Sequence, residues 1–136
     1  MKVAVRYFTR GGNTKKVADA IAQAVGVEAQ DLTSPLPEKV QILFLGNSVY
    51  AAGMDPAVKR FISENKDKIG MICNVSTAAL LPSTYKQMEK VAAQNGVSLS
   101  PREFHCRGSF SLMHRGHPDK ADLEAAKRFA LQVVDG

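Results

Sequence analysis

The stretch KVAVRYFTRGGNTKKVADAIAQAV, residues 2–25, decides the fold. Residues 2–8 are mostly apolar and predict a strand. Residues 14–25 predict an amphipathic helix, because apolar side chains such as Val17 and Ile21 recur at helical spacing. A short loop with two adjacent glycines joins the two runs. The stretch therefore predicts a strand that turns tightly into a helix.

The same alternation continues along the chain. Val40 to Gly46 reads VQILFLG, the apolar run expected of a strand that helices cover on both faces. Asp55-Pro56 is typical of a helix start, because Asp caps free N–H groups and Pro fits the first helical position. The other expected strands span residues 27–31, 71–76 and 99–106, and the expected helices after the first span residues 56–65, 83–95 and 119–134. This order predicts an α/β fold: a three-layer, doubly wound parallel sheet of five strands in the order 2-1-3-4-5.

Length and composition indicate one globular domain over residues 1–136. No apolar run approaches the ~20 residues of a membrane helix, and Met1 leads into the first strand without a signal-peptide pattern. With only two cysteines, we expect a cytoplasmic protein. The net charge is +5, but the sequence lacks a basic stripe interleaved with aromatic residues, so nucleic-acid binding is not expected. We expect a monomer or a weak dimer and no metal site.

A doubly wound sheet places its ligand beyond the carboxyl ends of the strands, where the strand order reverses. This rule selects three loops, over residues 9–13, 47–54 and 77–82. The first loop joins glycines to short polar side chains ahead of a helix, and helix N-termini favour anions such as phosphate. The alternative is a tight turn in which these side chains only cap the helix. The candidate phosphate contacts are Thr9, Arg10, Gly11, Gly12, Asn13 and Thr14.

This loop lacks the lysine of a P-loop and the spacing of G-x-G-x-x-G, which removes the main support for an ATPase or a dinucleotide dehydrogenase. Residues 9–14 instead resemble (T/S)-x-T-G-N-T, the phosphate loop with which flavodoxins bind flavin mononucleotide (FMN). Gly11 departs from the pattern, because the family usually has a hydroxyl residue there. Arg10 adds a charge, and its side chain either pairs with the phosphate or points to solvent.

The other two loops resemble the flavodoxin segments beside the flavin ring. Tyr50 stands where the family often stacks an aromatic side chain on the ring, although ordinary packing of Tyr50 is the alternative. Ala51 stands where the family commonly has glycine. The third loop lacks the family's aromatic and acidic residues, and Leu80 and Leu81 either cover the ring or belong to the core. The resemblance implies ring contacts at Ser48, Val49, Tyr50, Ala51, Ala52, Gly53, Ser76, Thr77, Ala78 and Ala79.

The resemblance implies a flavodoxin-like electron carrier that binds FMN non-covalently and shuttles electrons between redox partners. Because the chain has pI ≈ 9.4, those partners are expected to present acidic docking surfaces. One alternative is an NAD(P)H- or quinone-dependent flavin reductase of the same fold, which would oxidise NAD(P)H without a partner enzyme. The other is a flavin-free binding module, which would stay folded without taking up flavin.

Overall fold

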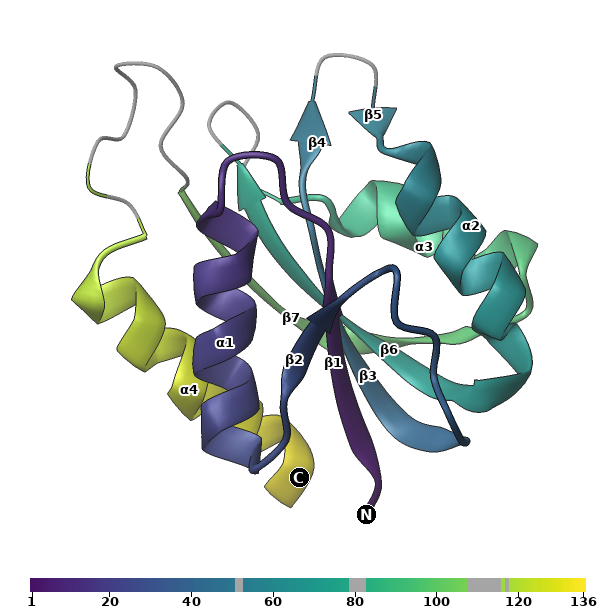
Figure 1. Cartoon of the computed structure of the whole chain (residues 1–136), viewed down its shortest axis with the longest axis horizontal. Coiled ribbons are helices and arrows are strands. Elements are labelled where there is room, and N and C mark those ends of the chain that lie inside the picture. Colours follow the sequence, from purple (N-terminus) through teal and green to yellow (C-terminus); the bar gives the residue numbers. More distant parts are fainter. Residues whose placement is uncertain (51–52, 79–82, 108–115, 117) are drawn as a thin grey trace.

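The structure is a computed structural model that describes residues 1–50, 53–78, 83–107, 116 and 118–136 (Figure 1). The strands are β1 (Val3–Tyr7), β2 (Ala29–Asp31), β3 (Val40–Asn47), β4 (Val49–Tyr50), β5 (Gly53–Met54), β6 (Ile69–Ala78) and β7 (Ser98–Arg107). The helices are α1 (Asn13–Val25), α2 (Pro56–Asn65), α3 (Tyr85–Gln94) and α4 (Lys120–Asp135), with the short 3-10 helix η1 (Lys66–Lys68) after α2. No helix among these residues is long and apolar enough to cross a membrane.

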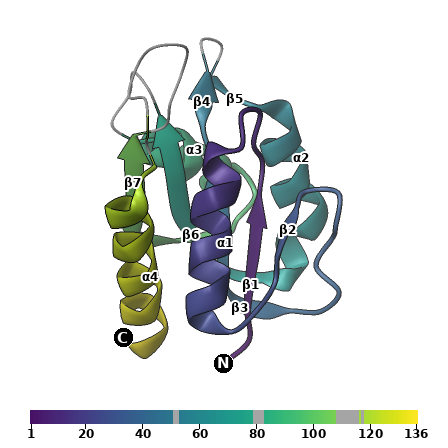
Figure 2. The ribbon, with the colours of Figure 1, turned by 60° about the vertical axis from the view of Figure 1, so that its left-hand side comes forward.

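The main sheet has five parallel strands in the order β2-β1-β3-β6-β7. This confirms the predicted α/β fold and strand order. Helices α1 and α4 cover one face of the sheet, and α2 and α3 cover the other (Figures 1 and 2). Because all main-sheet strands run in one direction, their carboxyl ends and the N-termini of the four α-helices lie along the same edge.

Each face of the sheet buries its own apolar cluster. The α1–α4 face holds side chains such as Val5, Ile21 and Phe44, and the α2–α3 face holds side chains such as Leu43 and Met88. The predicted helix boundaries agree with local chemistry. Asp119 and Asp122 form a reciprocal capping box at the start of α4, and the carboxylate of Asp55 accepts from the N–H of Ala57 at the start of α2.

The structure corrects the expected loops at two places. The segment expected as loop 47–54 begins inside β3 and contains the antiparallel pair β4–β5. The segment expected as loop 77–82 also begins inside a strand, because β6 pairs with β7 as far as Ala78. Both strands continue past their apolar runs because neighbouring strands satisfy their backbone groups, a factor that hydrophobic patterning does not report.

Candidate functional site

The loop between β1 and α1 is a tight turn around a left-handed glycine. Gly12 has a φ of 89° and is the N-cap of α1, a backbone conformation that an L side chain rarely adopts. Its N–H donates to Thr9 Oγ1 at 2.9 Å, which closes the turn. The N-cap residue Gly12 has no side chain that could cap the first turn of α1. The helix end therefore presents main-chain N–H groups with the dipole orientation that favours an anion.

Two hydroxyls that the sequence assigned to different loops meet beneath this turn. Thr14 Oγ1 and Thr77 Oγ1 are 2.9 Å apart, and both residues are buried. Their approach depends on Gly46 in β3, because a Cβ built on Gly46 would lie only 2.8 Å from Thr14 Cγ2. The missing side chain at Gly46 thus lets the first turn of α1 pack closely against the sheet.

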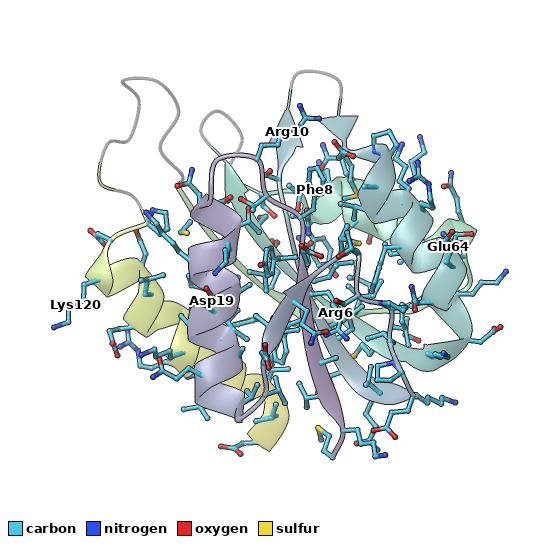
Figure 3. The ribbon with its side chains drawn as sticks, in the orientation of Figure 1. Arg6, Phe8, Arg10, Asp19, Glu64 and Lys120 are labelled. Carbon is cyan, nitrogen blue, oxygen red and sulfur yellow. The ribbon has the colours of Figure 1, made fainter. Side chains whose placement is uncertain are left out.

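Arg10 contacts a carboxylate of its own chain. Its Nη2 lies 2.7 Å from Asp55 Oδ2, and its guanidinium carbon lies 6.0 Å from the centre of the Phe8 ring (Figure 3). The pKa of the Asp55 carboxyl is lowered, first by the hydrogen bond from Ala57 N and next by the hydrogen bond from Arg10. The ion pair joins the loop after β1 to the start of α2. The contacts with Asp55 and Phe8 explain the orientation of the Arg10 side chain, which therefore does not require a bound phosphate.

Ser48, which follows β3, carries an unsatisfied hydroxyl. The residue is 5% exposed, and its Oγ has no hydrogen-bond partner among the residues that the structure describes. Buried hydroxyls without partners are uncommon and costly. Ser48 lies on the same sheet edge as α1, because Gly46, two residues earlier, accepts from the N–H of Phe8 and faces Thr14. An acceptor arriving at this edge would satisfy the hydroxyl.

Sequence reasoning missed a group of buried polar side chains at this edge. Asn47, Asn74 and Thr84 are each 0% exposed and are hydrogen-bonded to one another. Ser76, a ring contact predicted from the sequence, is also fully buried and accepts from the N–H of Thr84 at 3.4 Å. Their signal in the sequence is one Asn in each of two largely apolar strands, and it gives no indication that the two amides meet.

The remaining predicted ring contacts are described only in part. Val49 pairs with Met54, and Tyr50 pairs with Gly53, in the β4–β5 ladder. Ala78 is the last residue of β6. Five further residues lie outside the described ranges: Ala51, Ala52, Ala79, Leu80 and Leu81. The assignment of these residues to a flavin ring stays a prediction.

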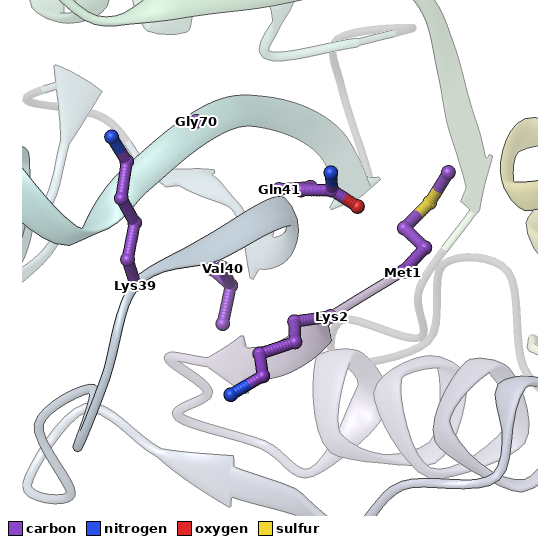
Figure 4. A pocket seen from close by; sticks show the side chains of 6 residues that line it. All are labelled: Met1, Lys2, Lys39, Val40, Gln41 and Gly70. Carbon is purple, nitrogen blue, oxygen red and sulfur yellow. The ribbon is translucent and has the colours of Figure 1, made fainter.

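A hollow in the surface and the two cysteines do not contribute to the predicted cofactor site. A hollow of about 620 Å³ lies at the amino ends of the strands, where Lys2, Lys39 and Gly70 contribute to its lining (Figure 4). It is on the opposite edge of the sheet from the loops above.

The thiols of Cys73 and Cys106 have their pKa raised to about 12, chiefly by burial, so both are protonated and poorly nucleophilic at neutral pH.

Comparison with known proteins gives a family and a fold. Residues 4–134 match a family model described as a flavodoxin domain. No curated protein sequence matches the chain. An archaeal flavodoxin structure superposes with a TM-score of 0.75 at 15% identity, over 99% of this chain and 97% of its own. Flavodoxin 1 from Bacillus cereus gives 0.74 at 18% identity, over 99% and 98%.

A third similar structure contains a ligand. A point mutant of a Fusobacterium nucleatum flavodoxin, bound to flavin mononucleotide, has a TM-score of 0.67 at 13% identity, over 99% of this chain and 96% of its own. At these sequence identities the superpositions show a shared fold, and they do not assign a role to any residue of this chain.

Proposed function

The chain belongs to the flavodoxin domain family, and from this we propose that it binds FMN non-covalently and carries electrons between redox partners. The bound flavin would supply the redox chemistry. The chain would bind the cofactor, orient it and limit its contact with water. The observation that carries the proposal is the unsatisfied Ser48 hydroxyl on the same sheet edge as the N-terminus of α1, where the N-cap residue is the glycine Gly12.

The residues of this edge fit a phosphate group. The first turn of α1 offers main-chain N–H groups, and Thr9 keeps a hydroxyl proton to donate while it accepts from Gly12. Ser48 offers a second hydroxyl proton. One of the paired hydroxyls of Thr14 and Thr77 already donates to the other, so that pair offers one further proton. We therefore assign the phosphate to these groups, and the charge of Arg10 is offset by Asp55.

We assign the ring side of the cofactor to the segments after β3 and β6. The proposed ring contacts still include residues 49–53 after β3, Ser76 and Ala78 in β6, and Ala79 directly after β6. Support comes from the position of β4 and β6, whose ends meet the same sheet edge as α1 (Figure 2). An aromatic side chain at position 50 would stack on a flat ring and exclude water from one of its faces.

A flavin titration tests this function. FMN and riboflavin, which lacks the phosphate, are added separately to the purified chain while flavin fluorescence and visible absorption are recorded. We expect FMN to bind at least tenfold more tightly than riboflavin, because several charge-assisted hydrogen bonds depend on the phosphate. Thr14→Val removes a hydroxyl with little change in shape and should weaken FMN binding while leaving riboflavin binding unchanged. A folded chain that binds neither flavin would contradict the proposal.

Partner proteins with acidic docking surfaces remain part of the proposal. Exposed cations stand near the starts of three helices: Lys16 on α1, Lys59 on α2 and Lys86 on α3. None of these three helices has an acidic residue in its first turn. Cations at helix N-termini oppose the helix dipole, so folding stability does not explain them. They would instead attract an acidic protein to the edge where the flavin is proposed to lie.

Electron transfer at two ionic strengths tests this docking. With an acidic iron–sulfur protein as the donor, we expect the rate to fall as ionic strength rises from about 0.01 M to about 0.15 M, because screening weakens attraction. The double variant Lys59→Glu/Lys86→Glu should lower the low-salt rate. The control Lys39→Glu/Lys66→Glu makes the same charge change at the amino edge and should not. A rate that is insensitive to salt would count against an acidic partner.

A further inference from the structure

A closed ring of hydrogen bonds joins three fully buried side chains on the α2–α3 face of the sheet. Asn47 Nδ2 donates to Asn74 Oδ1 at 2.8 Å, and Asn74 Nδ2 donates to Thr84 Oγ1 at 3.0 Å. Thr84 Oγ1 in turn donates to Asn47 Oδ1 at 2.6 Å. We call Asn47, Asn74 and Thr84 the amide ring. Asn47 is also fixed to its own strand, because its second amide proton reaches Leu45 O at 2.9 Å.

The amide ring lies between the two segments that flank the proposed flavin ring. Asn47 is the last residue of β3, so the segment with β4 and β5 begins immediately after it. Thr84 directly precedes α3 and therefore closes the segment that follows β6. Asn74 stands in β6 opposite Leu45, in the strand next to β3. One cluster thus holds the start of one segment and the end of the other.

Folding stability alone does not call for polar side chains here. Two residues earlier in the same strands, on the same face of the sheet, the side chains are apolar: Leu45 precedes Asn47, and Ile72 precedes Asn74. The residues of the amide ring are themselves 0% exposed. A buried polar group is costly unless all its partners are present, so a fully satisfied cluster permits one arrangement and penalises others. Thr84 makes no side-chain cap to α3, so helix capping does not account for its hydroxyl.

We propose that the amide ring is a positioning device that fixes the spacing between the two segments beside the flavin ring. The inference rests on the proposed function, because it assigns the two segments to the flavin. The three residues would act through the backbone at Ser48 and at Thr84, without touching the flavin themselves. Loss of the Thr84 hydroxyl would leave Asn47 Oδ1 and Asn74 Nδ2 without partners, and Ser48 and residue 84 would move apart as water hydrates these two groups.

The test compares three variants of the full chain. Thr84→Val removes the hydroxyl at nearly constant volume, and Thr84→Ser keeps it. The control is Asn65→Ala, which removes another buried amide: Asn65 accepts from Leu36 N and donates to Phe61 O at the far end of α2. Should Thr84→Val fail to fold, Thr84→Ala replaces it.

Two measurements are made on each variant. Amide hydrogen exchange in the flavin-free chain should quicken about tenfold at Ser48 and Thr84 in Thr84→Val. In Asn65→Ala it should quicken at Leu36 instead. FMN affinity should fall about tenfold in Thr84→Val, with a shifted visible band, because binding must then order both segments. Thr84→Ser should restore both values, and Asn65→Ala should leave the affinity within about twofold.

The outcomes separate the inference from the proposed function. Unchanged exchange at Ser48 in Thr84→Val would overturn the inference whether or not flavin binds. Equal FMN affinity and an equal spectrum in the native chain and Thr84→Val would also overturn it, because the amide ring would then support the fold alone. A chain that shows the expected exchange but binds no FMN would contradict the proposed function and leave the positioning of the two segments supported.

Discussion

Replacing Gly46 with alanine should loosen the contact between β3 and the first turn of α1. The new Cβ would lie 2.8 Å from Thr14 Cγ2 and 3.1 Å from Tyr7 Cβ. Carbon atoms in contact are normally ~3.5 Å or more apart, so the two gaps are short by ~0.7 and ~0.4 Å. Rotation of Thr14 would break its buried bond to Thr77, and Tyr7 Cβ is fixed by the backbone of β1. The first turn of α1 must therefore move away from the sheet.

The expected loss is about 2 kcal/mol of unfolding free energy, the usual range for an extra carbon in a packed site. Two neighbouring glycines provide controls with different physics. A Cβ at Gly11 would meet no atom within 4 Å, so Gly11→Ala should leave stability unchanged or raise it by up to ~1 kcal/mol. Gly12 also has open space, but its φ of 89° makes Gly12→Ala lose about 1–2 kcal/mol through backbone strain.

Urea unfolding of the flavin-free chains measures these differences, and an FMN titration of the same samples measures binding. We expect Gly46→Ala to weaken FMN binding about tenfold, because the displaced turn carries the proposed phosphate groups. Gly11→Ala serves as a control for stability only, because Gly11 is itself a candidate phosphate contact. Equal stability of Gly46→Ala and Gly11→Ala would refute the reasoning, since the two substitutions add the same atom and differ only in what surrounds it.

Three further predictions concern the Arg10–Asp55 ion pair, the Ser48 hydroxyl and the two cysteine thiols. In a double-mutant cycle with Arg10→Gln and Asp55→Asn, urea unfolding should give a coupling free energy of about 0.5 kcal/mol, because the Arg10 side chain is 61% exposed. Asn at position 55 can still cap α2, so the cycle isolates the ion pair. A coupling free energy of zero would contradict the pairing. Ser48→Ala should raise the stability of the flavin-free chain by up to ~1 kcal/mol yet weaken FMN binding, and a parallel change in the two would remove Ser48 from the phosphate site. Unfolding free energy should fall as pH rises above about 9, because unfolded thiols then ionise while burial raises the pKa of Cys73 and Cys106 to about 12. Unfolding measured at pH 9 and above should show a smaller decline in Cys73→Ala, and an unchanged slope would assign the decline to other groups.

The sequence alone predicted the fold and one of the three loops well. The mostly apolar run from Val40 to Gly46 and the helical spacing of Val17 and Ile21 report burial directly, because the sheet is covered on both faces. Gly12 was readable as a turn glycine ahead of a helix, and its φ of 89° agrees with that interpretation. These features are local, so neighbouring residues in the chain are enough to define them.

The role of Arg10 was open in the sequence, because its partner Asp55 stands 45 residues later in the chain. The meeting of Thr14 with Thr77, like that of Asn47 with Thr84, was also not predicted, since each pair belongs to different strands and loops. No periodicity specifies which polar side chains face each other across a sheet.

The amino-acid sequence by itself determined that strands and helices alternate, and hence that the sheet is parallel and its loops gather at one edge. Only the tertiary structure decided which side chains meet there: which hydroxyls pair, which carboxylate holds Arg10, and that the hydroxyl of Ser48 finds no partner in the part of the chain that the structure describes. The physical reason is range. Burial patterns repeat within a few residues, whereas hydrogen bonds and ion pairs at the edge need atoms within about 3 Å that chain folding alone brings together.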